Sequence, residues 1–235
     1  MLEIGSRLEL FVDDLLVESL KGGARRVLYH PVPREVVLTF DRPWEGPFCG
    51  YHAVAQVEDG VRLYYRGWPE LNGPDCTCVA VSADGIHFER PSLGLFEWQG
   101  SRDNSIVWSG RGCHNFTPFL DSNPDTPADQ RWKALASAGP GDSLVPFASP
   151  DGFRWRVLRE EPVITEGAFD SQNLAFFDGL RGEYVCFFRD FKGAPGKYEG
   201  VRDIKVCRSP DFLRWTAPEW LDYGDAPAEH LYTNA

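Results

Sequence analysis

One short phrase, written three times, decides the fold of this chain. It reads "SADGIHFERP" at 82–91, "SPDGFRWRVL" at 149–158 and "SPDFLRWTAP" at 209–218, and the copies start 67 and 60 residues apart. Recurrence of one phrase at such a period is the signature of a repeated structural unit. The sequence therefore predicts three consecutive units that share one turn.

The residues of the phrase suit a tight turn between two strands. The carboxylates of Asp84 and Asp151 can accept hydrogen bonds from backbone amides, and Gly85 and Gly152 allow the positive φ that such a turn needs. The third copy has Phe212 where the other two have glycine, so we expect its turn to differ. We expect the aromatic residue that follows each turn to pack between neighbouring units; these residues are Phe88, Trp155 and Trp215.

A pair of strand-like segments precedes each copy of the phrase. The clearest pair is 51–57 and 61–68, joined by a turn that contains Asp59-Gly60, and 174–190 repeats the arrangement around Asp178-Gly179. A third pair lies at 117–121 and 131–137. With a third strand before each turn and a short one after it, the unit is a four-stranded antiparallel sheet. Such a repeated sheet is a β-propeller blade, and the chain is predicted to be all-β.

The spacing of the phrase sets the expected boundaries within a single, incomplete propeller domain over 1–235. Propellers have typically about four to eight blades, and this chain holds three and the start of a fourth, so further blades or an oligomer are expected to complete the ring. The expected parts are N-terminal closing strands at 1–40, blades at 41–100, 101–168 and 169–228, and the start of a fourth blade at 229–235.

The composition of the chain restricts the kinds of partner that we expect it to bind. The formal charge of −11 argues against a nucleic-acid partner, which requires a basic surface. Aromatic residues make up 14% of the chain, a share that suits β-structure and also stacking on sugar rings. No segment has the about 20 consecutive apolar residues of a membrane helix, so no membrane partner is expected.

The termini and the cysteines bear on location and on metals. The start "MLEIGSRLEL" lacks the pattern of a secretory signal, which predicts a cytoplasmic protein, or an extracytoplasmic one if a leader was removed. Cys76 and Cys78 share one face of a strand, but no second pair follows at zinc spacing, and we expect six buried free thiols. We expect no cofactor and no metal site.

The repeated turn and the blade length resemble those of five-bladed β-propeller glycoside hydrolases of the invertase and arabinanase type. Other phrases resemble still more closely a group of uncharacterised bacterial glycosyl hydrolase-like proteins; they are "LFVDDLLVE" (10–18), "RPWEGP" (42–47), "DSQNLAFFD" (170–178) and "EHLYTNA" (229–235). The resemblance implies a hydrolase that acts on a carbohydrate substrate. The invertase-type signatures Asn-Asp-Pro-Asn, Arg-Asp-Pro and Glu-Cys are absent from the sequence.

In that family the first strand of each blade lines a central funnel, and the residues at its start form the site. Mapped onto this sequence, these starts are 45–52, 112–118, 169–173 and 229–234. Each start brings polar side chains to an otherwise apolar strand. Because burial of unpaired polar groups costs free energy, this clustering marks the strand starts as candidate site residues.

Glycoside hydrolysis needs two carboxyl groups, and the resemblance offers three candidates for these catalytic roles. Asp170 opens the third blade and is the first choice for the base or nucleophile. Glu229, in the fourth blade, suits the acid, and Glu45 is the reserve. For each of them a purely structural role is an open alternative.

Histidines, amides and aromatic residues at the same starts are candidates for binding the sugar. His52, His114 and His230 fall at equivalent blade positions, where they predict contacts to sugar hydroxyls; structural hydrogen bonds or a metal are the alternatives. Side-chain amides and aromatic rings complete the expected substrate-binding set, which consists of Asn115, Gln172, Asn173, Tyr232 and Trp44.

Two further dipeptides, Arg189-Asp190 and Arg202-Asp203, flank a glycine-rich loop. They are expected to be exposed ion pairs near strand ends, where such pairs contribute little. For the whole chain, two alternatives to a glycoside hydrolase are a non-catalytic carbohydrate-binding propeller fragment and a protein-interaction scaffold.

Overall fold

The computed structural model describes residues 3–5, 9–139, 143–193 and 198–225, and the chain divides into two units, 1–36 and 37–235. In the first unit, the described residues form turns and irregular backbone, with Arg26 paired to Asp14 at 3.0 Å. The closing strands expected over 1–40 are therefore not formed in the described residues there, 3–5 and 9–40. That residues 1–40 close a ring remains a prediction.

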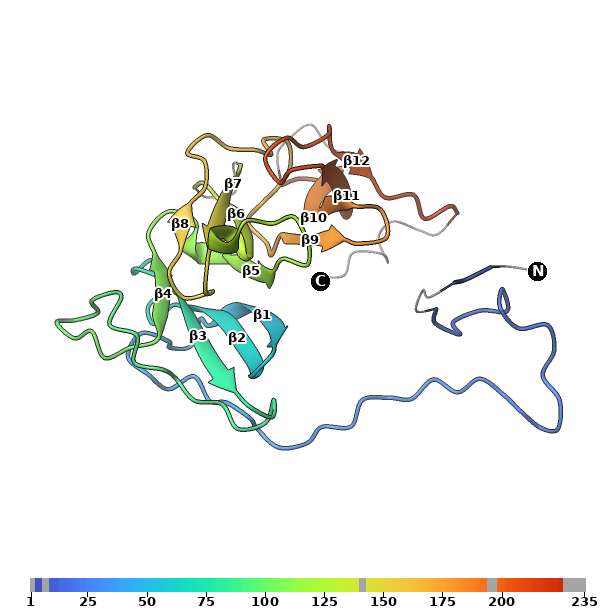
Figure 1. Ribbon diagram of the computed structural model, residues 1–235, viewed down its shortest axis with the longest axis horizontal. Helices are drawn as coiled ribbons and strands as arrows, with labels where there is room; N and C mark the ends of the chain where they lie inside the picture. The colour runs from blue at the N-terminus through green and yellow to red at the C-terminus, as the bar shows by residue number, and fades with distance from the viewer. Residues whose placement is uncertain (1–2, 6–8, 140–142, 194–197, 226–235) are drawn as a thin grey trace. The chain divides into compact units, whose positions relative to one another are not determined.

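The described residues of the second unit form three four-stranded antiparallel sheets, in which the strands follow one another in chain order (Figure 1). The first sheet contains β1 (Gly50–Val57), β2 (Gly60–Gly67), β3 (Cys76–Ser82) and β4 (Ile106–Ser109). The second contains β5 (Thr117–Leu120), β6 (Trp132–Ser137), β7 (Leu144–Ser149) and β8 (Arg156–Val157). The third contains β9 (Leu174–Asp178), β10 (Glu183–Lys192), β11 (Val201–Ser209) and β12 (Glu219–Trp220). Two 3-10 helices, η1 (Cys113–Asn115) and η2 (Ala128–Gln130), flank β5.

The predicted all-β class and four-stranded blades are confirmed, and the sheets have the arrangement of a partial β-propeller. The first strands of the sheets lie next to one another, since β1 contacts β5 and β5 contacts β9. All three predicted hairpins form, with Val57 paired to Gly60 across the first turn. The fourth strand of the first sheet lies beyond the expected boundary at residue 100, because residues 90–105 are inserted between Glu89, which bridges Val81, and β4.

Large apolar clusters join neighbouring sheets. Trp155 packs in a cluster shared by the first and second sheets, together with Tyr64 and Phe147. Trp215 packs against a second cluster, which contains Leu135 from the second sheet and Tyr184 from the third. These two aromatic residues therefore pack between sheets as predicted, whereas Phe88 packs against a third cluster within the first sheet.

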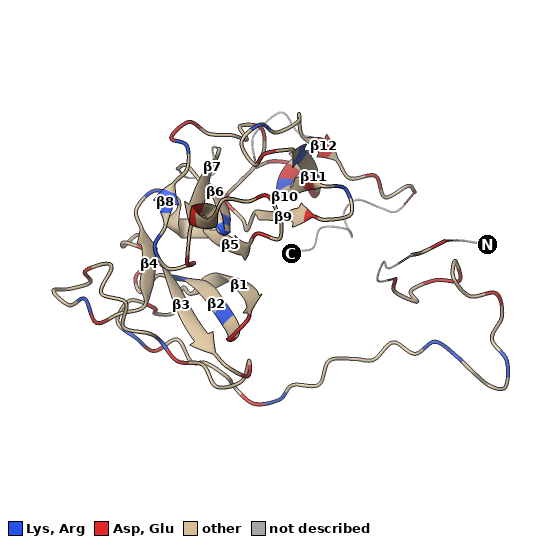
Figure 2. Ribbon diagram, viewed as in Figure 1, with Lys and Arg blue, Asp and Glu red and all other residues tan. Residues whose placement is uncertain are grey.

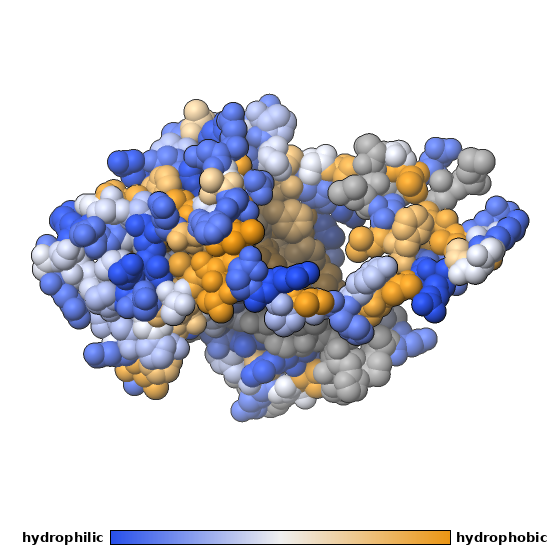
Figure 3. All heavy atoms as spheres, turned by 90° about the horizontal axis from the view of Figure 1, so that it is seen from below, coloured by the Kyte–Doolittle hydropathy of each residue, from blue (hydrophilic) through white to orange (hydrophobic). Residues whose placement is uncertain are grey.

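The surface of the second unit carries both charged and apolar residues. Acidic and basic residues are interspersed along its chain (Figure 2). Some apolar side chains remain exposed, among them Val54, Phe176 and Leu180. The space-filling view shows apolar areas between hydrophilic ones on the face that it presents (Figure 3). None of the helices in the described part of the chain is long and apolar enough to cross a membrane.

The repeated phrase forms the turn that its residues predict. The Oδ1 atom of Asp151 accepts hydrogen bonds from the amides of Phe153 and Arg154, both at 2.8 Å. Asp84 accepts the amides of Ile86 and His87 in the same way. These bonds lower the pKa of Asp84, with the amide of His87 as the largest cause.

The expectation that the third turn differs is wrong. Phe212 adopts a φ of 69°, close to the 76° of Gly152, and Asp211 accepts the amides of Leu213 and Arg214. A left-handed conformation costs a residue with a side chain about 1–2 kcal/mol. The ring of Phe212 offsets this cost because it is fully buried between the second and third sheets, with Phe119 and Tyr184 as neighbours.

Phe212→Gly is therefore expected to destabilise the protein although it restores the glycine of the other copies. Loss of the buried ring costs about 3–5 kcal/mol and relief of the left-handed backbone returns about 1, so the free energy of unfolding should fall by about 2–4 kcal/mol. Chemical denaturation measures this change. Phe212→Ala is the control and should be less stable still by about 1 kcal/mol, because it keeps the backbone cost. A Phe212→Gly protein as stable as the parent would contradict the account.

The six cysteines are free thiols, as predicted, with Cys49 half-buried and the other five buried. Burial raises the pKa of Cys49 to about 12, with further contributions from Glu45 and Cys76.

The expected exposure of the two Arg-Asp dipeptides is wrong at three positions. Asp190 is part-buried and paired with Lys205 at 2.7 Å. Arg189 is mostly buried beside Asp170, and Asp203 is buried and paired with Lys192. Burial occurs because β10 and β11 are interior to their sheet.

Candidate functional site

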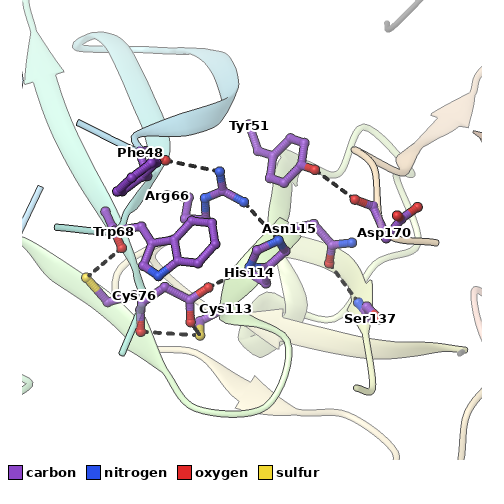
Figure 4. A network of polar contacts seen from close by, with 12 residues as sticks. Phe48, Tyr51, Arg66, Trp68, Cys76, Cys113, His114, Asn115, Ser137 and Asp170 are labelled. Atoms are coloured by element: carbon purple, nitrogen blue, oxygen red, sulfur yellow. Dashed lines mark hydrogen bonds and ion pairs between the residues drawn. The ribbon is translucent and has the colours of Figure 1, made fainter. Parts of the chain in front are cut away.

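Polar side chains from all three sheets meet where the first strands begin (Figure 4). A cavity of about 360 Å³ lies at this place. The first sheet contributes Asp75, from the loop between β2 and β3, and the third contributes Asp170, from the loop before β9. The rest of the lining comes from the second sheet and its loops, and consists of Gly110, Arg111, Gly112, Cys113, His114, Asn115, Ser137, Ala138 and Gly139.

The local sequence explains how the second sheet brings His114 to the cavity. Gly112 has a φ of 88°, and a Cβ atom there would lie 3.0 Å from both Ala136 and Phe147. Only glycine allows the chain to approach β6 and β7 this closely and then turn into η1. The hydroxyl of Thr77 on β3 donates to the Cys113 carbonyl at 3.2 Å and fixes η1 against the first sheet.

Asp170, the first choice for the base or nucleophile, is exposed at this cavity. Its side chain is 47% exposed and forms an ion pair with Arg189 of β10. Its main-chain carbonyl accepts a hydrogen bond from the hydroxyl of Tyr51 on β1 at 2.7 Å. Asp170 is thus an accessible carboxylate that contacts from two sheets hold in place.

Glu45, the reserve candidate, is fully buried in the first sheet. Its carboxylate accepts the Tyr65 hydroxyl at 2.6 Å and two nitrogens of Arg90 at 2.6 and 2.9 Å. The Arg42 amide also donates to it, at 2.9 Å. Four hydrogen bonds to a buried carboxylate favour a structural role. Glu229 lies outside the described residues, and so do His230 and Tyr232.

His114 is the polar centre of the site. Its ring is 43% exposed, and its Nδ1 atom lies 2.7 Å from Asp75 Oδ2. Its Nε2 atom lies 2.9 Å from a guanidinium nitrogen of Arg66, on β2. The rings of Tyr51 and Trp68 lie edge-on to the imidazole, at 5.8 and 5.3 Å between centroids. His52, by contrast, is exposed on β1, where its ring lies 5.3 Å from that of Phe40.

The side-chain amides of the expected binding set join the sheets at the edge of the site. Asn115 is fully buried and donates to the carbonyls of Phe169 and Ser171, while its oxygen accepts the Ser137 amide at 2.9 Å. Asn173 is also buried and donates to the same two carbonyls.

The remaining expected binding residues lie nearer the surface. Gln172 donates to the His52 carbonyl at 2.8 Å. Trp44 is half-buried against the cluster within the first sheet and does not line the cavity. Asn115, Asn173 and Gln172 therefore hold the starts of β1, β5 and β9 together, whatever they contact in a ligand.

Sequence reasoning missed Asp75 and Arg66. Burial raises the pKa of Asp75, but the hydrogen bonds from His114 and Cys113 lower it more, so its net pKa lies below the ordinary value. No local pattern distinguishes either residue, because Asp75 lies in a loop and Arg66 within a strand. Among the described residues, no group of three or more His, Cys, Asp or Glu side chains is placed to hold a metal ion.

Neither a family model nor a curated protein matches this chain. Solved structures do. A "putative glycosidase" from Bacteroides thetaiotaomicron VPI-5482 is 18% identical, with a TM-score of 0.50 over 79% of this chain and 59% of its own. A glycosyl hydrolase from Bacteroides ovatus is 15% identical, with a TM-score of 0.48 over 74% of this chain and 52% of its own.

The chain thus spans between half and two thirds of the length of these two structures. The similarity to the Bacteroides thetaiotaomicron protein confirms, at the level of the fold, the resemblance to propeller glycoside hydrolases. At 18% identity it establishes the fold alone.

Proposed function

We propose that this protein hydrolyses glycosidic bonds with a pair of carboxylates, Asp170 and Glu229, in the central funnel of a propeller. The observation that carries the proposal is the position of Asp170. It is a half-exposed carboxylate at a cavity to which three sheets contribute, next to the adjacent first strands β1, β5 and β9. The fold shared with a structure described as a glycosidase supports the choice of reaction.

The surroundings of Asp170 suit the role of base or nucleophile. A base or nucleophile must be able to reach the sugar, and the Asp170 carboxylate is half-exposed at the cavity and paired with Arg189. The acid must bring a proton to the leaving oxygen, and Glu229 is proposed for it from the family resemblance. The two carboxyl groups of such an enzyme lie about 5–5.5 Å apart for retention of configuration and about 6.5–9.5 Å apart for inversion.

The proposed substrate is a carbohydrate that enters the cavity beside His114. The half-buried rings of Tyr51 and Trp68 lie edge-on to the His114 imidazole, next to the residues that line the cavity, and aromatic rings provide stacking surfaces for sugars. We further propose that additional blades or a second copy complete the ring. The same rings would serve a protein that binds a sugar without cleaving it, which makes a non-catalytic carbohydrate-binding propeller the second candidate.

A panel of aryl glycosides and polysaccharides tests the proposal. The expected result is release of reducing sugar from at least one substrate, together with saturable binding of the same sugar by calorimetry. Saturable binding without release from any substrate would favour the non-catalytic candidate. Absence of both release and glycan binding would overturn the proposal and favour a protein-interaction scaffold.

A further inference from the structure

The hydrogen bonds of His114 determine which of its ring nitrogens carries a proton. Nε2 faces a guanidinium nitrogen of Arg66 at 2.9 Å. A guanidinium has only donors, so Nε2 must be the acceptor and cannot carry a hydrogen in this contact. The hydrogen of the neutral ring is therefore on Nδ1, which lies 2.7 Å from Asp75 Oδ2 and donates to it.

Asp75 is held in the form that this arrangement requires. Its other oxygen, Oδ1, accepts the Cys113 thiol at 3.0 Å. Burial raises the pKa of Cys113, which keeps that thiol protonated as a donor. The loop that carries Asp75 is fixed in turn, because the indole nitrogen of Trp68 donates to the Gly73 carbonyl at 3.1 Å. A carboxylate on a fixed loop therefore accepts the hydrogen bond that the imidazole Nδ1–H donates.

Arg66 connects His114 to the start of the first strand of its sheet by direct contacts. Its guanidinium donates to the Phe48 carbonyl at 3.0 Å and lies over the rings of Tyr51 and Trp68, 4.5 and 4.8 Å from their centroids. Trp68 and Phe48 lie beside it (Figure 4). The guanidinium is thus fixed by a carbonyl, an imidazole and two aromatic faces.

Tyr51 completes the connection to Asp170. Its backbone has a φ of 52°, an uncommon conformation for a bulky residue, at the register shift between Gly50 and Ala53. This conformation places the ring under Arg66 and lets the hydroxyl donate to the Asp170 carbonyl at 2.7 Å. Non-glycine residues with positive φ cost free energy and cluster at functional sites.

We propose that Asp75 and His114 form a positioning pair that fixes Arg66 and, through Tyr51, the loop that carries Asp170. In this assignment His114 fixes the orientation of the Arg66 guanidinium through its hydrogen bonds to Asp75 and Arg66. Neither of its nitrogens transfers a proton to a substrate. The tautomer of His114 follows from the contacts alone. The effect on turnover rests on the proposed function.

The tautomer is tested directly by nitrogen NMR of the protein labelled at histidine, near neutral pH. The expected result is a protonated, pyrrole-type Nδ1 and an unprotonated, pyridine-type Nε2 for the signal that disappears in His114→Phe. His87 is the internal reference, because its Nδ1 also lies 2.6 Å from a carboxylate, that of Asp84, but its side chain is 85% exposed. A protonated Nε2 in His114 would overturn the proposal.

Turnover of the substrate found in the panel provides the second measurement. Misplacement of a catalytic group by about 1 Å can cost about 100-fold in rate, so Asp75→Ala should lower kcat by up to about 100-fold with little change in KM. Asp75→Asn keeps an acceptor oxygen for Nδ1 and should recover most of kcat. Asp84→Ala, which removes the matched carboxylate beside His87, should leave kcat unchanged.

The outcomes separate this proposal from the proposed function. Normal kcat in folded Asp75→Ala, in a protein that Asp170→Asn inactivates, would overturn the positioning pair and leave the function standing. If Asp75→Ala does not fold, an Asp75→Asn protein with a kcat as low as that of folded His114→Phe would overturn it instead. If the parent protein cleaves no substrate, the proposed function fails, and the NMR result alone decides the pair.

Discussion

Asp170→Asn is expected to lower kcat by at least about 100-fold while sugar binding stays largely intact, because a positioned acid or base contributes about 10²–10⁴-fold to a reaction. The amide has nearly the shape of the carboxylate but can act neither as a base nor as a nucleophile. Asp170 is about half exposed, so the substitution should not perturb the core. Steady-state kinetics and calorimetry with the substrate from the panel measure the two quantities.

Two further variants make this result interpretable. Glu229→Gln should lower kcat by a similar factor, since the acid and the base act on the same bond. Asp129→Asn is the matched control, because Asp129 also pairs with an arginine, Arg156 at 2.6 Å, but lies on η2 away from the cavity lining. Unchanged kcat in both Asp170→Asn and Glu229→Gln would show that the catalytic assignment is wrong.

The fold could be predicted because its information is local. A turn whose aspartate accepts amides two and three residues ahead is written into consecutive residues, as at Asp151 with Phe153 and Arg154. Three copies of this turn fix where the strands before and after each copy lie in the sequence. Phe212 shows where local reasoning fails. The conformation of its backbone is set by burial of its ring against Phe119 and Tyr184, which are far away in the sequence.

The site could be predicted only in part, for the same reason. The prediction of Asp170 rests on its place before a strand of a recognisable blade, and the structure places it at the cavity, whereas its catalytic role stays a prediction. Asp75 and Arg66 gain their roles from contacts to His114, 39 and 48 residues away, and no local pattern encodes such contacts. Glu45 shows the converse, since a glutamate at a strand start looked available for chemistry but is buried against Arg90 and Tyr65.

The buried ion pair between Lys133 and Asp121 leads to a large expected change in stability. The side chain of Lys133 is 3% exposed and that of Asp121 0%, and the Tyr184 hydroxyl donates to the same carboxylate at 2.7 Å. The pair thus connects the second sheet with the third. Removing one member of a buried pair costs about 3–5 kcal/mol, because the remaining charge is left without a partner.

Asp121→Asn should therefore lower the free energy of unfolding by about 3 kcal/mol or more, measured by chemical denaturation. The double variant Asp121→Asn/Lys133→Met should recover a large part of this loss, since it removes the buried charge together with its partner. Asp129→Asn again serves as the control, because it breaks an exposed pair and should cost less than about 1 kcal/mol. Equal losses from Asp121→Asn and Asp129→Asn would mean that water reaches Lys133 and that the junction between the two sheets is open there.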